Sequence, residues 1–349
     1  MITTDLVAIV LLLLLAAYAC GGGADFGAGI WDLLAGDGYR GARPRSLVDD
    51  AMAPVWEANN VWLVFVLVVT WTGFPPVFEA VMSTAWAAVV LAALGLVLRG
   101  AAFAVRKPTT GLVRRRRLGL VFGVASLLTP YFLGSVLGAV ASGRVPPGNR
   151  QGDPVTSWLN PTSALFGLVG LAAAAFIAAT FLISDARRFR APDLETYFRL
   201  RSVVSAGLLV LLMVAGLVVV HQDAPHLYDG LTSGWGLVFA LVAAAGILAT
   251  ALLATRTTLR GTRLVPVLAV ASFVLAWGFA QRPYALPTSL TIDQAAGDPT
   301  TMRWLVGVTV VSVLVVGPAL ALLYRLDTTE RLTADRDEDL LEVPARRRT

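Results

Sequence analysis

Four ionisable side chains stand in stretches that are otherwise apolar, and they are Asp25, Glu57, Glu79 and Arg99. A charge inside a bilayer is costly, so each of them is a candidate functional residue. A carboxylate in such a place can carry protons, and a nearby guanidinium favours its ionised form. The sequence therefore points either to a polar inlet for protons, to a buried ion cluster that fixes helix packing, or to charges that snorkel to the interface.

The strongest of these candidates is Glu57, which follows Pro54 in the run Trp56-Glu57-Ala58-Asn59-Asn60-Val61-Trp62. Proline favours a helix start, so Glu57 falls in the first helical turn, where the helix dipole favours a carboxylate. Asn60 lies three residues further on and shares its helix face. An acid with Asn59 and Asn60 beside it can order water and relay protons. The alternative is a helix-terminal charge between two interfacial tryptophans.

We expect structural roles for Glu79 and for the glycine-rich stretch. Glu79 follows the turn Phe74-Pro75-Pro76 at the opposite end of the membrane, where an interfacial position is expected. The stretch Gly21–Gly29 lacks the strand and the register of a dinucleotide fingerprint. Small residues let helices approach closely in lipid, so we expect this stretch to pack against a partner of similar architecture.

Cofactor chemistry within this chain is not expected. The sequence has one cysteine, Cys20, and two histidines, His221 and His226, which flank an expected outer loop. That supply excludes a disulfide framework and a cysteine-rich metal site, and it leaves no axial haem pair inside the bilayer. We therefore expect no bound haem, no metal site and no catalytic residue for covalent chemistry in this chain.

The elements that must position these residues are membrane helices. The chain has 349 residues, of which 56% are hydrophobic and 15% are charged, and its mean hydropathy is +0.71. A soluble domain has about 25% charged residues. The pattern predicts an all-α integral membrane protein with nine transmembrane helices, at 5–25, 54–75, 78–104, 118–142, 158–183, 202–221, 232–255, 262–281 and 303–324.

The arginines and lysines predict the orientation. Of the 28 basic residues, 23 fall after spans one, three, five and seven or in the tail, and 4 fall in the alternate loops. The positive-inside rule then places the N-terminus outside and the C-terminus in the cytoplasm. It also explains the basic run Arg114–Arg117 as an orientation signal, so no nucleic acid is expected.

The expected organisation is a membrane domain over 1–325 and a cytoplasmic tail over 326–349. A loop rich in proline divides the first eight spans into two four-helix halves, about 1–142 and about 157–281, and the ninth helix covers about 303–324. No internal repeat is visible.

Several short motifs together resemble subunit II of cytochrome bd-type quinol oxidases. Each is weak alone, but their order and spacing cover nearly the whole chain. The motif residues include Gly27 at the end of span one, Trp56 and Trp62 around Glu57, and Phe74-Pro75 in the outer turn. The other matching segments are Gly23-Ala24-Asp25-Phe26-Gly27-Ala28-Gly29, Arg99-Gly100-Ala101-Ala102-Phe103, Gln281-Arg282-Pro283-Tyr284-Ala285-Leu286-Pro287 and Leu290-Thr291-Ile292.

The resemblance implies a role without bound haem. In that family, subunit II forms a pseudo-symmetric heterodimer with subunit I, which carries the b and d haems and the quinol site. The family's acid after the first tryptophan helps to bring protons from the cytoplasm, and that position is Glu57. The usual pair there is Asp-Gly, so Glu57-Ala58 is a departure. We expect Asp25 and Arg99 to tune the charge of Glu57.

The resemblance also implies a location in the bacterial plasma membrane, with contacts to lipid. It allows a structural quinone or lipid in this chain and a small single-span subunit in the complex. Two alternatives stay open on the residues alone. One is a proton- or cation-coupled secondary transporter with Asp25, Glu57 and Arg99 as its coupling site. The other is a structural partner that only shields subunit I from lipid.

Overall fold

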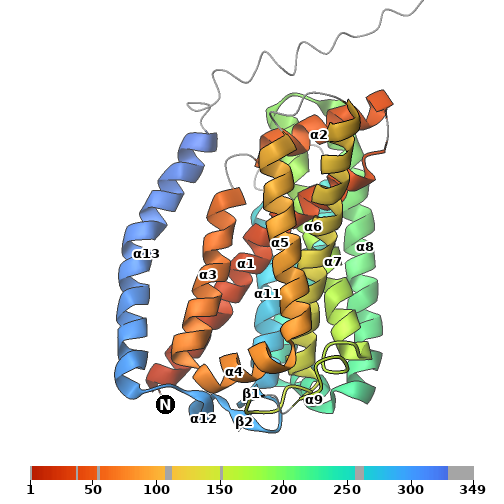
Figure 1. Ribbon diagram of the computed structural model, residues 1–349. Helices are drawn as coiled ribbons and strands as arrows, with labels where there is room; N and C mark the ends of the chain where they lie inside the picture. The colour runs from red at the N-terminus through yellow and green to blue at the C-terminus, as the bar shows by residue number, and fades with distance from the viewer. Residues whose placement is uncertain are drawn as a thin grey trace, which may run out of the picture.

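A computed structural model of the chain describes residues 2–36, 38–52, 56–106, 112–149, 152–255 and 263–328, and it is almost entirely helical (Figure 1). A two-stranded antiparallel ribbon of β1 and β2 joins the helices in the described part of the chain. The elements are α1 (Ile2–Leu34), α2 (Gly38–Met52), α3 (Trp56–Gly73), α4 (Pro75–Thr84), α5 (Trp86–Arg106), α6 (Leu112–Ala141), α7 (Pro161–Arg188), α8 (Pro192–Asp223), α9 (Pro225–Leu231), α10 (Gly234–Ala254), α11 (Leu264–Gln281), β1 (Tyr284–Leu286), β2 (Leu290–Thr291), α12 (Ile292–Ala295) and α13 (Pro299–Thr328).

The expected all-helical membrane fold is confirmed. Within the described ranges, eight helices are long and apolar enough to cross a membrane, and the bent pair α3 and α4 makes a ninth candidate. The expected count of nine is therefore approximate. Helices α1 and α8 extend well beyond the apolar runs at 5–25 and 202–221, because a helix continues past the hydrocarbon core wherever its polar residues find partners.

Span 78–104 is wrong as a single helix. Helix α4 turns away from α3 by 116°, and α5 begins only at Trp86. The cause is local: Pro75 disfavours a helical backbone at Phe74 and suits the first position of a new helix. Figure 1 shows α4 lying across one end of the bundle, where it connects α3 to α5.

The loop expected after the first span is also largely helical. Helix α2 lies across the opposite end of the bundle from α4 (Figure 1). Its Leu47 and Val48 are buried in a cluster with Trp31 and Phe198, while its Arg43 is exposed and pairs with Asp193. We call this the arginine-rich end; among its arginines are Arg43, Arg45, Arg106, Arg187, Arg199, Arg201 and Arg263.

Helix α1 runs through the middle of the molecule and contacts α3, α6, α7 and α11. Glycines make this possible. A Cβ atom on Gly27 would lie 1.9 Å from the carbonyl oxygen of Ala174 on α7, and one on Gly29 would lie 2.1 Å from the hydroxyl of Ser126 on α6. The expected close helix approach is therefore present, but the helices that pack there belong to this chain, so the expectation of a partner at this stretch is wrong.

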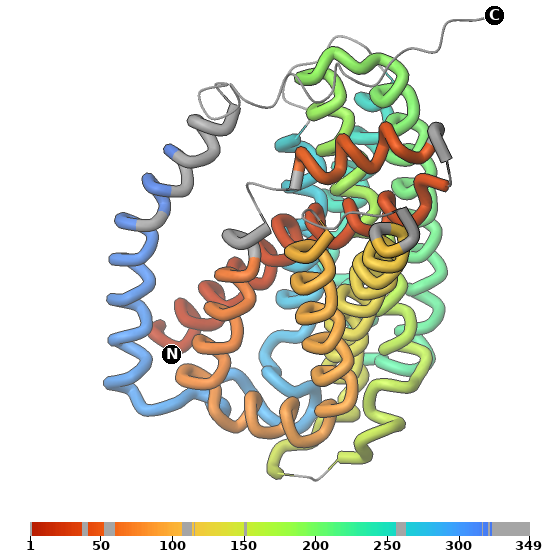
Figure 2. The backbone as a smooth tube through the Cα atoms, turned by 45° about the horizontal axis from the view of Figure 1, so that its top comes forward, coloured from red at the N-terminus to blue at the C-terminus, as the bar shows by residue number. Residues whose placement is uncertain are grey.

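Helix α13 stands at the edge of the bundle, as Figure 2 shows from a second angle. It contacts α1 and α3. Its span is mostly exposed, with Trp304 71% and Leu314 68% accessible in the isolated chain. A helix this apolar belongs against lipid or another membrane protein.

Candidate functional site

A buried ion pair joins α1 to α5 in the half of the bundle toward the arginine-rich end. The Nη2 atom of Arg99 lies 2.7 Å from Oδ1 of Asp25, and the two side chains are 2% and 4% exposed. Arg99 also donates to the backbone oxygen of Asp25 at 3.1 Å and, through Nε, to the hydroxyl of Ser126 at 3.1 Å. Asp25 and Arg99 stand out in the sequence by their positions in apolar runs, and the structure brings them together.

Aromatic rings complete the surroundings of this pair. The guanidinium carbon of Arg99 lies 5.1 Å from the centroid of Phe26 and 5.0 Å from that of Phe122. Rings at such distances attract a cation, and more strongly when water is excluded. A charge buried to this degree persists only when it is paired and hydrogen-bonded, and Arg99 meets both conditions.

A second ion pair joins the same two helices, α1 and α5, closer to the arginine-rich end, and the hydropathy pattern did not indicate it. Arg106 holds both carboxylate oxygens of Asp32 at 3.0 Å, and its Nη2 lies 3.4 Å from Asp49 on α2. Nε of Arg45, also on α2, lies 3.9 Å from the same Asp32. This cluster ties α2 to α1 and α5.

The repeat has a signal in the sequence. Asp25 and Asp32 are seven residues apart, as are Arg99 and Arg106. Helices α1 and α5 run in the same direction (Figure 1), so equal spacing on both produces two successive ion pairs between them. The two pairs lie about 10.5 Å apart along the helices, at ~1.5 Å per residue. Asp32 and Arg106 lie outside the apolar runs at 5–25 and 78–104, so the hydropathy pattern assigns them to loops.

Phe122 of α6 contacts the arginines of both ion pairs. Its ring is fully buried and lies within cation–π distance of Arg99 and, at 5.8 Å, of Arg106. Phe103 packs on the same ring with centroids 6.0 Å apart. Apolar rings therefore adjoin both arginines.

The motif around Glu57 is described only in part. Trp56, Glu57 and Asn59 belong to the first turn of α3, but their side chains lie outside the described residues. Asn60 is half-buried, and Trp62 packs against a buried cluster that includes Phe26, the neighbour of Asp25. The structure thus places the start of α3 beside the part of α1 that carries the first ion pair.

The remaining candidates lie toward the other end. Glu79 is exposed on α4. His226 pairs through Nε2 with the backbone oxygen of Gln281 at 3.2 Å, and the ring of His221 lies 4.5 Å from that of Tyr228. In the ranges that the structure describes, no three His, Cys, Asp or Glu side chains group as a metal site would require.

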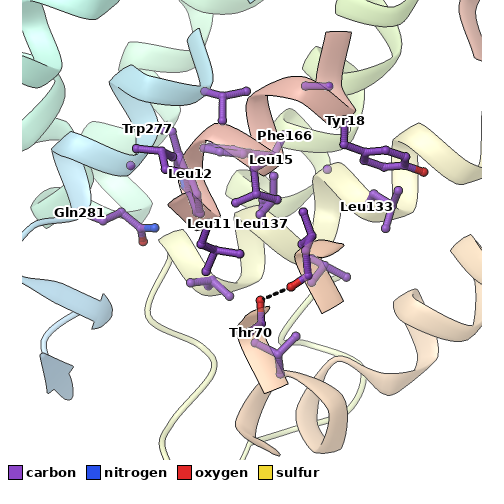
Figure 3. A pocket seen from close by; sticks show the side chains of 18 of the residues that line it. Leu11, Leu12, Leu15, Tyr18, Thr70, Leu133, Leu137, Phe166, Trp277 and Gln281 are labelled. Carbon is purple, nitrogen blue, oxygen red and sulfur yellow. Dashed lines mark hydrogen bonds between the residues drawn. The ribbon is translucent and has the colours of Figure 1, made fainter. Parts of the chain in front are cut away.

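An apolar cavity of about 420 Å³ occupies the half of the bundle that contains α4 and β1. Side chains from α1, α3, α6, α7 and α11 line it, and Figure 3 shows Leu11, Leu15, Leu137 and Phe166 projecting toward it. Tyr18 and Gln281 lie at opposite sides of that view.

Three polar atoms of this lining are buried without a hydrogen-bond partner in the described part of the chain: the hydroxyl of Tyr18, Nε1 of Trp277 and Oε1 of Gln281. A buried polar atom left unpaired costs free energy comparable to a lost hydrogen bond. The cavity therefore suits an elongated apolar molecule that carries polar groups. Composition did not reveal this cavity, because its lining comes from helices that are far apart in the sequence.

Known proteins resemble this chain over most of its length. A protein of Bacillus subtilis (strain 168), provisionally assigned as cytochrome bd menaquinol oxidase subunit II, is 22% identical over 321 residues, which cover 88% of this chain and 91% of that protein. A chain in the solved structure of bd oxidase from Geobacillus thermodenitrificans shares the fold, with a TM-score of 0.72, 24% identity and coverage of 93% of this chain and 98% of that chain.

A family-level match extends over the helices and over the segments that carry the motifs on α1, α3 and α5. The family model described as cytochrome bd terminal oxidase subunit II matches residues 3–327, which is nearly the whole chain. This chain belongs to the cytochrome bd terminal oxidase subunit II family.

Proposed function

We propose that this chain is the haem-free subunit of a quinol-oxidising, dioxygen-reducing membrane complex and that its partner is the haem-bearing subunit I. Membership of the subunit II family carries the proposal. The chain's own residues support it, because its two histidines lie near one end of the bundle, where both contact tyrosine rings. Haem iron usually requires a histidine, cysteine, methionine or tyrosine ligand that faces the cofactor. The complex resides in a bacterial plasma membrane.

Glu57 is the proton-entry carboxylate in this proposal. It lies in the first turn of α3, and that helix begins toward the arginine-rich end (Figure 1). The basic residues place this end in the cytoplasm under the positive-inside rule. Asn59 and Asn60 order water beside the carboxylate, and the Asp25–Arg99 pair sets the local charge. Reduction of dioxygen to water consumes protons, so a titratable group at the entry supports turnover.

The test compares two carboxylates of the same chain. Glu57→Gln keeps the size and hydrogen bonding of the side chain but removes its titration. Glu79→Gln is the matched control, because Glu79 is exposed at the other end. We expect the Glu57→Gln complex to assemble with full haem content and to consume oxygen at least about tenfold more slowly, a lower limit set below the ~10²–10⁴-fold that general acid–base groups contribute. The control should keep the wild-type rate.

Equal oxygen consumption by wild type and Glu57→Gln between pH 6 and 8 would overturn this assignment. Glu57 would then be a structural charge at a helix start. A Glu57→Asp variant retains a titratable carboxylate on a shorter side chain, and we expect it to keep most of the oxygen consumption that Glu57→Gln loses.

The apolar cavity holds a structural quinone or lipid in this proposal. Both molecules have a long apolar body, and each carries oxygen atoms that accept hydrogen bonds. The hydroxyl of Tyr18 and Nε1 of Trp277 are donors without a partner among the described residues, and they line this cavity. Bound there, such a molecule would stabilise the folded bundle by mass action.

Solvent extraction of the purified complex tests this part of the proposal. We expect about one quinone or lipid per complex to resist detergent exchange, and Tyr18→Phe with Trp277→Phe to reduce that retained amount severalfold, since each loses a buried hydrogen bond. Tyr228→Phe serves as the control, because Tyr228 does not line the cavity. Equal retention in all these variants would contradict the assignment.

A further inference from the structure

Arg201 is a half-buried arginine near the start of α8 that lacks an acidic partner. Its Nη1 donates to the backbone oxygen of Tyr197 at 3.1 Å, and none of the described carboxylates lies within salt-bridge distance of it. The nearby acids are already engaged: Asp193 with Arg43, Glu195 with Arg187 and Arg199, and Asp32 with Arg106. The guanidinium therefore keeps donors available for an anion from outside the chain.

Aromatic rings hold this guanidinium in place. Its carbon lies 3.1 Å from the centroid of Tyr197 and 5.8 Å from that of Trp31. The hydroxyl of Tyr197 is buried and has no hydrogen-bond partner in the described part of the chain. Arg45 of α2 interacts electrostatically with the same tyrosine. The guanidinium of Arg201 and a hydroxyl donor that lacks an acceptor thus belong to two side chains in direct contact.

An apolar stripe begins directly beside Arg201. Val204, Leu208 and Leu211 follow it at helical spacing, and they are 60%, 48% and 63% exposed. These residues belong to a predicted membrane span. A ligand at Arg201 can therefore place its charged end at the arginine-rich end while its apolar part lies along α8.

We propose that Arg201 and the Tyr197 hydroxyl bind the phosphate of an anionic phospholipid whose acyl chains lie on the stripe formed by Val204, Leu208 and Leu211. Guanidinium groups match the geometry of phosphate oxygens and can bind two of them at once. Basic residues at the membrane surface attract anionic lipids. The site is independent of Glu57 and of the apolar cavity, which lies in the other half of the bundle.

The experiment titrates the delipidated complex in neutral detergent with dioleoyl phosphatidylglycerol or dioleoyl phosphatidylcholine and counts bound lipid by native mass spectrometry. We expect phosphatidylglycerol to bind more tightly than phosphatidylcholine. Arg201→Gln should weaken phosphatidylglycerol binding about fivefold to tenfold, as the loss of a charge-assisted hydrogen bond predicts, and Tyr197→Phe about twofold to threefold. Arg117→Gln removes an exposed arginine of α6 and should change the affinity less than about twofold.

Two further measurements keep the proposal falsifiable. If Arg201→Gln fails to assemble, Arg201→Lys takes its place, because it retains the charge but not the planar donor pair. Arg201→Lys should weaken phosphatidylglycerol binding, and Arg201→Lys combined with Tyr197→Phe should weaken it further. Inorganic phosphate at millimolar concentration should not displace the lipid. Displacement would indicate a site for free phosphate, and equal phosphatidylglycerol affinity of wild type and Arg201→Gln would indicate that the lipid binds elsewhere; either result overturns the proposal.

Discussion

The two arginines of α5 have different surroundings although their partners are alike. Arg99 is sealed among Asp25, Ser126 and two phenylalanine rings, whereas Arg106 shares its carboxylates with the surface helix α2. A planar guanidinium can donate several hydrogen bonds and stack on rings at the same time, which an ammonium group cannot do. Lysine at position 99 would therefore satisfy the charge of Asp25 but not the rest of the site.

Loss of one partner of the sealed pair should destabilise the chain strongly. Arg99→Met leaves Asp25 buried without its countercharge, and we expect a loss of about 3–5 kcal/mol in the free energy of unfolding. Asp25→Leu combined with Arg99→Met removes both charges and should recover most of that loss. Thermal unfolding of the purified complex, followed by size-exclusion chromatography, gives the comparison.

Arg43→Met is the control for this experiment. Arg43 and Asp193 form an exposed pair, with side chains 45% and 51% accessible. Exposed pairs contribute about 0–1 kcal/mol, so this variant should unfold close to the wild-type temperature. If Arg99→Met did the same, burial of the pair would not be the source of its effect.

At the scale of elements, the contact between α1 and α7 depends on the absence of side chains. The position that a Cβ on Gly27 would take is occupied by backbone atoms of Ala174 and by the methyl group of Ala178. Backbone cannot move aside as a flexible side chain can, so the helices must separate if Gly27 is replaced.

Gly27→Ala should therefore lower the stability of the chain by about 1–3 kcal/mol, the range found for overpacked cores. Gly207→Ala is the matched control, because a Cβ there would meet no atom within 4 Å. Both variants make the same chemical change within a membrane helix. Alanine has a higher helix propensity than glycine, so Gly207→Ala should not lower the unfolding temperature. Unfolding temperatures that fall equally in the two variants would show that the α1–α7 contact is not responsible.

At the scale of the whole molecule, the charges predict which end faces the cytoplasm. The single cysteine, Cys20, is buried, so introduced cysteines can report the topology with little background. Val155 is 51% exposed in the loop between α6 and α7, and Thr196 is exposed near the start of α8 at the arginine-rich end.

We expect a membrane-impermeant maleimide to label Val155→Cys in intact cells and to label Thr196→Cys only after the cells are permeabilised. The expectation follows from the 23 to 4 distribution of basic residues. The reverse labelling pattern would invert the molecule in the membrane. It would also place Glu57 on the outer side and remove the basis for cytoplasmic proton entry there.

The sequence by itself determined the fold class and most of the spans, and it singled out Asp25 and Arg99, the two residues of the sealed ion pair. These properties depend on local composition: about 20 apolar residues cross a bilayer, and a charge inside such a run stands out wherever its partner lies. The motifs on α1, α3 and α5 also identified the family before any contact was known.

Only the tertiary structure decided which charges meet and where the chain leaves space. Asp32 and Arg106 looked like loop charges because hydropathy ends each span with its apolar run and cannot show that α1 and α5 continue beyond it and meet there. The docking of the surface helix α2 and the apolar cavity depend in the same way on contacts between distant segments. A local pattern records what each residue prefers, whereas ion pairs and cavities arise from how whole helices pack, and that packing is set by the combined shape of their faces.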